Sequence, residues 1–242
     1  MNRSAVVLLC LYLIAGVALT VSVLGQTPTP TPTPAPKLAA MSREIREEVD
    51  RVASSDAGKR ATGALSLGQM GAAATGAILY LVPLLDDASK VYALGKGATE
   101  VALIAGEALV EIGPKGTGVL IGQLKRENSA PRYARCTAAK VLGRKKVATA
   151  APVLRAALAH SDVDDIEGLY IVEALAAIGD SDSLASIMTF LSRDSIGLRT
   201  DGGMRWQFFQ EPLKSLTDQD FETRKDALAW WQKKMGTHKE QK

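Results

Sequence analysis

Four related pentapeptides run through the middle of the chain: LGQMG at 67–71, LVEIG at 109–113, LGRKK at 142–146 and LAAIG at 175–179. Their leading leucines are 42, 33 and 33 residues apart. A helical repeat of about this length is typical of a solenoid, in which each helix pair buries its apolar face against the next pair. We therefore expect an all-α solenoid of about four helix pairs.

The sequence around each pentapeptide predicts two helices per repeat. In the third repeat they lie near 131–143 and 150–160, and in the fourth near 163–178 and 182–193. The second helices carry apolar residues three or four positions apart, as a buried helical face requires. These residues are Leu81 and Leu84, Leu120 and Leu124, Leu154 and Leu158, and Ile187 and Leu191.

Both ends of the solenoid are predicted to be capped. A charged helix at about 39–53 places Ile45, Val49 and Val52 on one stripe, as an N-terminal cap requires. All three tryptophans lie in 196–242, a C-terminal cap with a basic tail, whereas the solenoid itself spans 39–195. We expect the last helix to begin at Thr217, Asp218 or Asp220, and the aromatic side chains to be buried. An exposed aromatic strip for a sugar or peptide is the alternative.

The spacing between the first two repeats is longer than the rest. The extra residues, about 86–99, are expected to form a longer loop or a frayed extra turn. Insertions in repeat proteins tend to collect on the binding face, so this segment is of functional interest.

The third repeat, APRYARCTAAKVLGR at 130–144, has an arginine, a pair of small residues and then Leu-Gly. The first repeat has the same pattern. The matching positions are Arg135, Ala138, Ala139, Leu142 and Gly143 in the third repeat, and Arg60, Gly63, Ala64, Leu67 and Gly68 in the first. This pattern resembles bacterial HEAT repeats of the armadillo type, including those of phycobilisome-lyase relatives. The second and fourth repeats depart from it, with Ala102 and Gly168 in place of the arginine. The resemblance covers about 56–195 and implies a fold but hardly a function.

The N-terminus looks like a targeting segment. Arg3 precedes an almost unbroken apolar run at 5–24, and Gln26 follows small residues suited to cleavage. Residues 1–25 are thus either a signal peptide or a retained membrane anchor, since the run is long enough to span a bilayer. Both alternatives predict export, to the periplasm or the exterior, or attachment to the inner membrane. A lipid on Cys10 is a third alternative, which the large Leu9 disfavours. Residues 26–38, rich in Thr and Pro, form an extended spacer.

Residues able to perform chemistry are scarce. The chain has two histidines and two cysteines, too few for a zinc site. Asp162, Asp164 and Glu173 have the spacing of a calcium loop, but Ile166 and Glu167 do not suit one, so capping of a helix start is preferred. Cys136 is expected to be buried. We expect no cofactor, no metal and no catalytic residues.

Charge is segregated along the chain. The segment 125–146 has eight basic residues and one acid, whereas 160–182 has seven acids and neither Lys nor Arg. The basic segment is a candidate surface for an acidic protein or peptide partner, and export argues against nucleic acid. The candidate partner-binding residues are Lys125, Arg126, Arg132, Arg144, Lys145 and Lys146. The alternative is a solvated face in which Arg135 pairs with acids of the next repeat.

These features favour a non-catalytic protein-interaction scaffold of the cell envelope. The alternative is a lyase-like auxiliary that holds a small ligand in the concave groove of the solenoid. A smooth charged groove would indicate the scaffold, and a deep apolar pocket with converging polar groups would indicate the ligand-holding protein.

Overall fold

The computed structural model describes residues 40–92, 97–193 and 206–240. The chain divides into two units, Met1–Ala35 and Pro36–Lys242, and the second is described here by itself. The targeting segment predicted at 1–25 and the spacer predicted at 26–38 lie outside the described residues.

The described residues are almost entirely helical, as predicted. The α-helices are α2 (Arg43–Val52), α3 (Ala57–Gln69), α4 (Ile78–Leu81), α5 (Val101–Ile112), α6 (Pro114–Gln123), α7 (Arg132–Arg144), α8 (Ala151–Leu158), α9 (Asp165–Ile178), α10 (Leu184–Leu191), α11 (Gln207–Thr217) and α12 (Arg224–Glu240). Short 3₁₀ segments are Gly71–Ala77, Val82–Asp86, Arg126–Asn128, Ala148–Ala150 and Ser181–Ser183. Two strands, β1 (Lys90–Tyr92) and β2 (Ala98–Glu100), complete the set.

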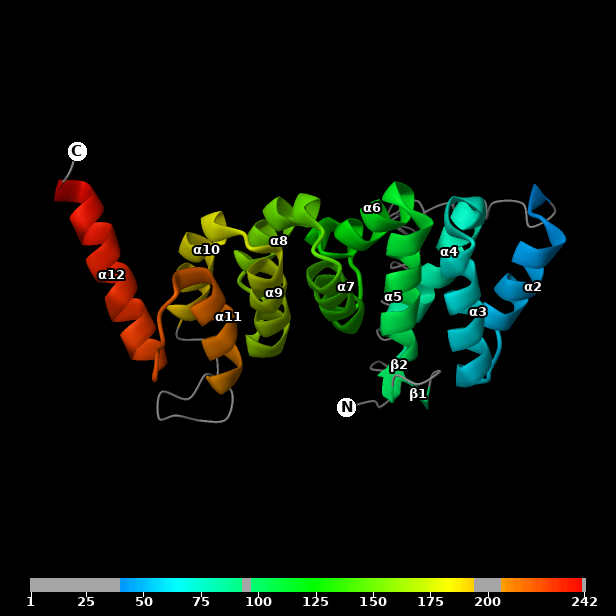
Figure 1. Cartoon of the computed structure of the whole chain (residues 1–242), viewed down its shortest axis with the longest axis horizontal. Helices are drawn as coiled ribbons and strands as arrows, with labels where there is room; N and C mark the ends of the chain where they lie inside the picture. Colours follow the sequence, from blue (N-terminus) through cyan, green and yellow to red (C-terminus); the bar gives the residue numbers. More distant parts are fainter. Residues whose placement is uncertain (1–39, 93–96, 194–205, 241–242) are drawn as a thin grey trace, which may run out of the picture. The chain divides into compact units, whose positions relative to one another are not determined.

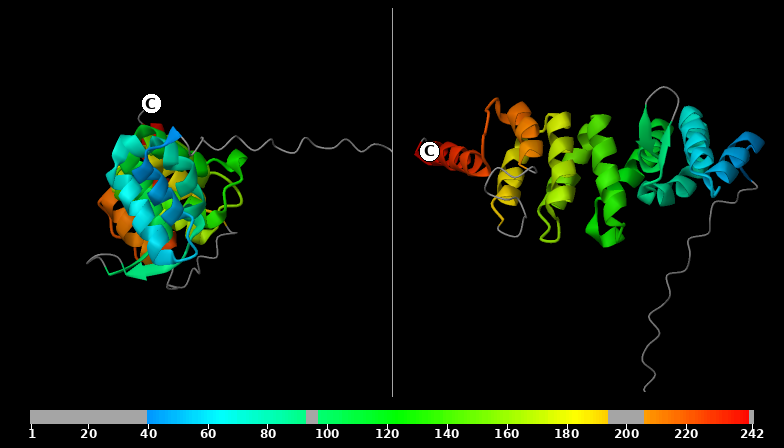
Figure 2. Two further views of the ribbon diagram at one scale, coloured as in Figure 1. Left: turned by 90° about the vertical axis from the view of Figure 1, so that its right-hand side faces the viewer. Right: turned by 90° about the horizontal axis from the view of Figure 1, so that it is seen from below.

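The helices stack as pairs in a row (Figures 1 and 2). The first helix of each pair packs on the first helix of the next, so that α3, α5, α7, α9 and α11 form one layer. The second helices are α4, α6, α8, α10 and α12, of which α10 packs on both α8 and α12. We call the solvent-facing side of the first layer the first-helix face. This arrangement is the predicted all-α solenoid, which α11 continues by packing on α9 and α12 by packing on α10.

The repeated leucines form the core between successive pairs. Leu67, Leu109, Leu142 and Leu175 each have 0% of their surface exposed. The apolar residues predicted on the second helices are buried as well. One continuous core therefore runs through the row, because no single pair could bury its apolar surface alone.

The glycine of the Leu-Gly motif allows neighbouring first helices to approach closely. A Cβ on Gly143 of α7 would lie 2.6 Å from the Cα of Ala174 on α9. A Cβ on Gly68 of α3 would lie 2.9 Å from the Cα of Ala108 on α5. Since carbon atoms normally stay about 3.5–4.0 Å apart, only glycine fits at these positions.

The missing arginine of the fourth repeat also has a packing reason. A Cβ on Gly168 would lie 2.0 Å from the ring of Phe190, which is fully buried. Phe190 in turn lies 6.4 Å from the ring of Phe209 on α11. The space that arginine occupies in the third repeat is therefore taken in the fourth by the ring of Phe190 on α10, which packs toward Phe209.

The N-terminal cap forms as predicted, but the last helix begins later than predicted. The stripe of Ile45, Val49 and Val52 is buried. Asp218, expected as an N-cap, instead ends α11 in a left-handed conformation with φ 56°. The backbone N–H groups of Thr223 and Asp226 donate to each other's side chains, which satisfies the first turn of α12.

Strands β1 and β2, which we call the hairpin, lie in the segment where a longer loop or a frayed extra turn was expected, and residues 93–96 between them are outside the described residues. Strands β1 and β2 pair in antiparallel fashion, with Val91 opposite Thr99. Val91 is buried whereas Tyr92 is 90% exposed. A β-branched residue that alternates with polar neighbours favours a strand. The expectation of a loop or frayed turn did not take this two-residue period into account.

Candidate functional site

The basic residues predicted to bind a partner lie in three different environments. Lys125 is exposed after α6, while Arg126 and Arg132 lie beside α9. Arg144, Lys145 and Lys146 are exposed at the end of α7. The structure therefore divides the set rather than assembling it into one patch.

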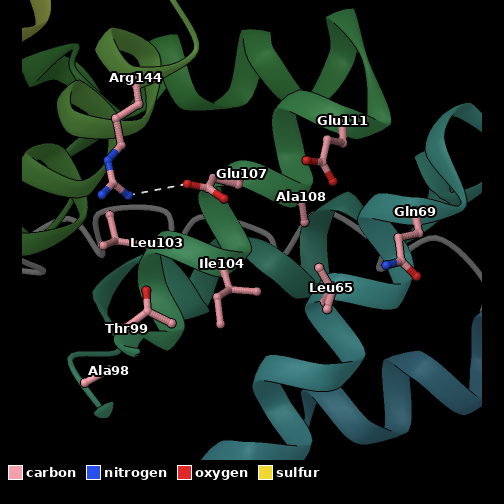
Figure 3. Close-up of a pocket in the computed structure, with 10 residues that line it drawn as sticks. All are labelled: Leu65, Gln69, Ala98, Thr99, Leu103, Ile104, Glu107, Ala108, Glu111 and Arg144. Carbon is pink, nitrogen blue, oxygen red and sulfur yellow. Dashed lines mark hydrogen bonds and ion pairs between the residues drawn. The ribbon is translucent and has the colours of Figure 1, made fainter. Parts of the chain in front are cut away.

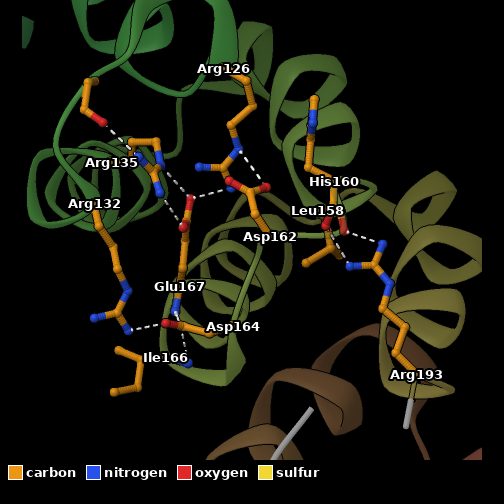
Figure 4. A network of polar contacts seen from close by, with 11 residues as sticks. Arg126, Arg132, Arg135, Leu158, His160, Asp162, Asp164, Ile166, Glu167 and Arg193 are labelled. Carbon is orange, nitrogen blue, oxygen red and sulfur yellow. Dashed lines mark hydrogen bonds and ion pairs between the residues drawn. The ribbon is translucent and has the colours of Figure 1, made fainter. Parts of the chain in front are cut away.

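Arg126 and Arg135 share one buried carboxylate (Figure 4). The Nη2 of Arg126 donates to Oε1 of Glu167 at 2.9 Å, and Arg135 donates to both oxygens of Glu167 at 2.9 Å. The Glu167 side chain is only 2% exposed. Arg135 also donates to the carbonyl of Ala130. The predicted pairing of Arg135 with the next repeat is confirmed, and Arg126 takes part in the same internal link.

Arg132 makes a more exposed link to the same helix. Its Nη2 lies 2.6 Å from Oδ2 of Asp164, which raises the pKa of Arg132. Burial opposes ionisation of Asp164, but its hydrogen bonds outweigh burial and lower its pKa. Asp164 also accepts from the N–H groups of Ile166 and Glu167 as the N-cap of α9. The acidic run thus caps a helix, and among the described residues no group of side chains could hold a metal ion.

Arg144 and Lys145 face the carboxylates of α5. Arg144 lies 3.4 Å from Glu107, and Lys145 lies 3.1 Å from Glu111. Both pairs are partly exposed, with the Arg144 side chain 53% accessible. Such pairs contribute little to stability, so these groups are available to a ligand.

A groove lies beside these pairs on the first-helix face, between α3 and α5 and extending to α7 (Figure 3). We call it the α3–α5 groove, and its volume is about 590 Å³. Its apolar lining consists of Leu65, Leu103, Ile104, Ala98 and Ala108. Its polar lining consists of Gln69, Thr99, Glu107, Glu111 and Arg144. Figure 3 shows Glu107 of α5 and Arg144 of α7 pointing toward each other.

The hairpin supplies one wall of this groove. Ala98 and Thr99 of β2 line it, and β1 packs on α3. The sequence indicated that the insertion would lie on the binding face, and it lies on the face with the groove. Its effect on the groove was not visible in the sequence, because it depends on the hairpin folding back over α3 and α5.

A second hollow lies between α9 and α11, and we call it the α9–α11 cleft. Its volume is about 350 Å³, and Ile166, Leu169, Tyr170 and Phe208 supply most of its lining. Ile166 and Phe208 are unusually exposed for their type, at 41% and 49%. Phe209, which follows Phe208 on α11, is buried. The expected burial of the aromatic tail therefore holds for Trp206, Phe209 and Phe221, holds only in part for Trp230 and Trp231, and fails for Phe208.

Between the groove and the cleft, charged side chains contact aromatic side chains. The Nζ of Lys140 lies 5.4 Å from the centroid of the Tyr170 ring. Burial raises the pKa of Tyr133, and so does the hydrogen bond that its hydroxyl donates to Glu100. Burial also raises the pKa of Glu173, although Lys140 opposes this shift. Lys140 belongs to the basic segment but not to the predicted candidate set, because nothing in its spacing shows which ring it faces.

Cys136 is buried, as predicted. Burial raises the pKa of its thiol to about 11, so the thiolate needed for reactivity is suppressed at neutral pH.

In the part of the chain that the structure describes, no helix is long and apolar enough to cross a membrane.

Comparisons with known proteins gave one structural neighbour of note. No family model matches the chain, and no curated protein matches it. A solved complex of CpcE and CpcF of phycocyanin lyase from Nostoc sp. PCC7120 is similar, with 22% identity and a TM-score of 0.44. The match covers 84% of this chain and 71% of that chain.

The fold of the described residues is a HEAT-like repeat solenoid. Its own stacked helix pairs establish this, and they agree with the motifs read from the sequence. The neighbour is a complex of CpcE and CpcF of phycocyanin lyase. At this identity and score, the likeness transfers neither activity nor partner to this chain.

Proposed function

We propose that this protein is an accessory protein that holds a ligand in the α3–α5 groove. The observation that carries the proposal is the groove itself, whose lining combines apolar side chains with the Glu107–Arg144 pair. Its volume of about 590 Å³ lies within the roughly 300–1,000 Å³ typical of small-molecule sites. The alternative function expected from the sequence is therefore better supported than the envelope scaffold.

The polar groups of the groove suit binding and orientation. Glu107 and Glu111 stand one helical turn apart on α5, and each pairs with a cation from the end of α7. A ligand could compete for either pair at little cost, because exposed pairs contribute only about 0–1 kcal/mol. Apolar contacts with Leu103 and Ile104 would supply affinity, while these pairs would select the ligand's polar end.

The proposal includes export of the protein. Arg3 and the apolar run at 5–24 support it, and so do the Thr and Pro residues that follow. An exported holder would receive its ligand or partner outside the cytoplasm. Export is independent of the groove, and each proposal has its own test.

Native mass spectrometry of protein purified from its own cells tests the ligand. We expect the wild-type chain to carry additional mass that Ile104→Arg no longer retains. Ile104 is half-buried in the groove, so arginine would fill it while keeping its charge at the surface. The matched control is Leu79→Arg, which alters a 50% exposed leucine on α4 outside the groove and should keep the mass. Equal occupancy of wild type and Ile104→Arg would refute the proposal.

A further inference from the structure

The junction between α5 and α7 differs from the junctions on either side of it. At α3–α5 and at α7–α9, the glycine after the repeated leucine lies against the alanine before the next repeated leucine. These pairs are Gly68 with Ala108 and Gly143 with Ala174. The matching positions at the α5–α7 junction are Val110, which follows Leu109, and Val141, which precedes Leu142. Two branched side chains therefore stand where the neighbouring junctions have a glycine and an alanine.

This exchange alters how the two helices touch. A Cβ on Gly106, one turn before Val110 on α5, would lie 2.8 Å from Cγ2 of Val141. At the neighbouring junctions a Cβ on the glycine would instead meet the backbone Cα of the next helix, at 2.9 and 2.6 Å. Helices in backbone contact cannot shift without steric overlap, whereas helices that meet through side chains can slide as the side chains readjust.

The α5–α7 junction also lacks the arginine pair that strengthens the solenoid elsewhere. Arg135 of α7 donates to both oxygens of the buried Glu167 on α9 (Figure 4). Arg60 of α3 lies 2.7 Å from Asp87, and both side chains are largely buried. The matching residue of α5 is Ala102, which can form no such pair.

The ion pairs that do join α5 to α7 lie at the surface. They are Arg144 with Glu107 at 3.4 Å, and Lys145 with Glu111 at 3.1 Å. All four side chains are at least 29% accessible, and pairs of this kind contribute only about 0–1 kcal/mol. A hydrogen bond from Tyr133 of α7 to Glu100, just before α5, adds a further polar contact.

The apolar contacts of this junction lie on its inner side. Besides α5, α7 packs on the 3₁₀ segment Val82–Asp86. Leu85 of that segment and Val141 of α7 are both 0% exposed. Because these contacts lie in the core and the ion pairs lie on the first-helix face, a rotation about the core contacts would separate the ion pairs first.

We propose that the α5–α7 junction is a hinge between two blocks of the solenoid, α2 to α6 and α7 to α12. Arg144 belongs to the second block, whereas the other residues that line the α3–α5 groove belong to the first. Opening the hinge therefore moves Arg144 away from Glu107, and closing it returns Arg144 to the groove. A ligand that contacts both blocks favours the closed form. This coupling to a ligand rests on the proposed function, whereas the hinge rests on the packing alone.

Double electron–electron resonance between spin labels tests the hinge in the full chain carrying Cys10→Ser. The buried Cys136 can stay, because its thiol resists labelling. Labels at Gln69→Cys on α3 and Ala177→Cys on α9 report on the distance between the blocks. Control pairs within one block are Asp50→Cys with Lys115→Cys, and Ala177→Cys with Gln232→Cys. All these positions are exposed. We expect the pair between the blocks to give a broader distance distribution than either control pair.

Removal of the surface ion pairs tests what closes the hinge. Glu107→Gln with Glu111→Gln should raise the ratio of open to closed molecules about fivefold, the bias expected of two exposed pairs, and should lengthen the mean distance between the blocks. Glu47→Gln breaks an exposed pair within α2 and is the matched control, which should leave that distribution unchanged. Melting temperatures of the labelled chains establish that each is folded.

The outcomes separate the hinge from the ligand-holding function. Equal widths for all three label pairs, or a control pair as broad as the pair between the blocks, would overturn the hinge. A distribution that Glu107→Gln with Glu111→Gln leaves unchanged would overturn the ion pairs as its closing contact. A broad distribution between the blocks in a protein that carries no ligand mass supports the hinge and refutes the proposed function, and the opposite pair of results does the reverse.

Discussion

The close contact between Gly143 and Ala174 provides a sharp test of the helix stacking. A methyl group at position 143 would lie 2.6 Å from the Cα and 2.9 Å from the Cβ of Ala174. The obstacle is backbone, so α7 and α9 would have to separate by roughly 1 Å to restore normal carbon contacts. Overpacking of this kind costs about 1–3 kcal/mol. Alanine recovers about 0.5–1 kcal/mol of helix propensity, and we expect Gly143→Ala to lose about 1–2 kcal/mol overall.

Gly118→Ala is the matched control for this change. Gly118 is exposed in α6, and nothing lies within 4 Å of the position that its Cβ would take. The same substitution should there stabilise the fold by about 0.5–1 kcal/mol, because only the propensity term remains. Urea unfolding followed by circular dichroism measures both variants. If Gly143→Ala proves as stable as Gly118→Ala, the close approach of α7 and α9 is wrong.

Three further predictions concern the ion pairs and the N-terminus. Glu167→Gln should cost about 3–5 kcal/mol in urea unfolding, because it leaves the largely buried Arg135 without its counter-charge. Asp162→Asn changes a 62% exposed carboxylate and should cost under about 1 kcal/mol. Similar losses for the two variants would contradict the buried link. Burial alone would raise the pKa of Asp87, but hydrogen bonds from Arg60 and Ser89 lower it below 3.8. Its stabilisation is therefore present above about pH 4 and lost as pH falls through the folded-state pKa, so Asp87→Asn should lower the melting temperature at about pH 7 and hardly at about pH 2; an equal effect at both would refute the ion pair. N-terminal sequencing of the mature protein should begin at or near Gln26, and protein recovered from cytosol with Met1 intact would overturn export.

The sequence by itself determined the class of fold and its periodicity. Leucines recurring at the same point of each repeat must be buried somewhere, and helix pairs too small to bury them alone must stack. The same reasoning located Leu142 in the core, Cys136 in a buried site and Arg135 in a link to the next repeat. These results depend on local spacing, which a helix converts directly into a face.

Only the tertiary structure decided which polar residues are free and where the hollows lie. Arg126 and Arg144 look alike in the basic segment, yet one is held by the buried Glu167 and the other lies at the edge of the groove. The exposure of Phe208 beside the buried Phe209 likewise depends on how α11 docks on α9. The α3–α5 groove and the α9–α11 cleft are each made by helices that are separated in the sequence, and the packing of those helices sets their shape. No local sequence pattern specifies this packing.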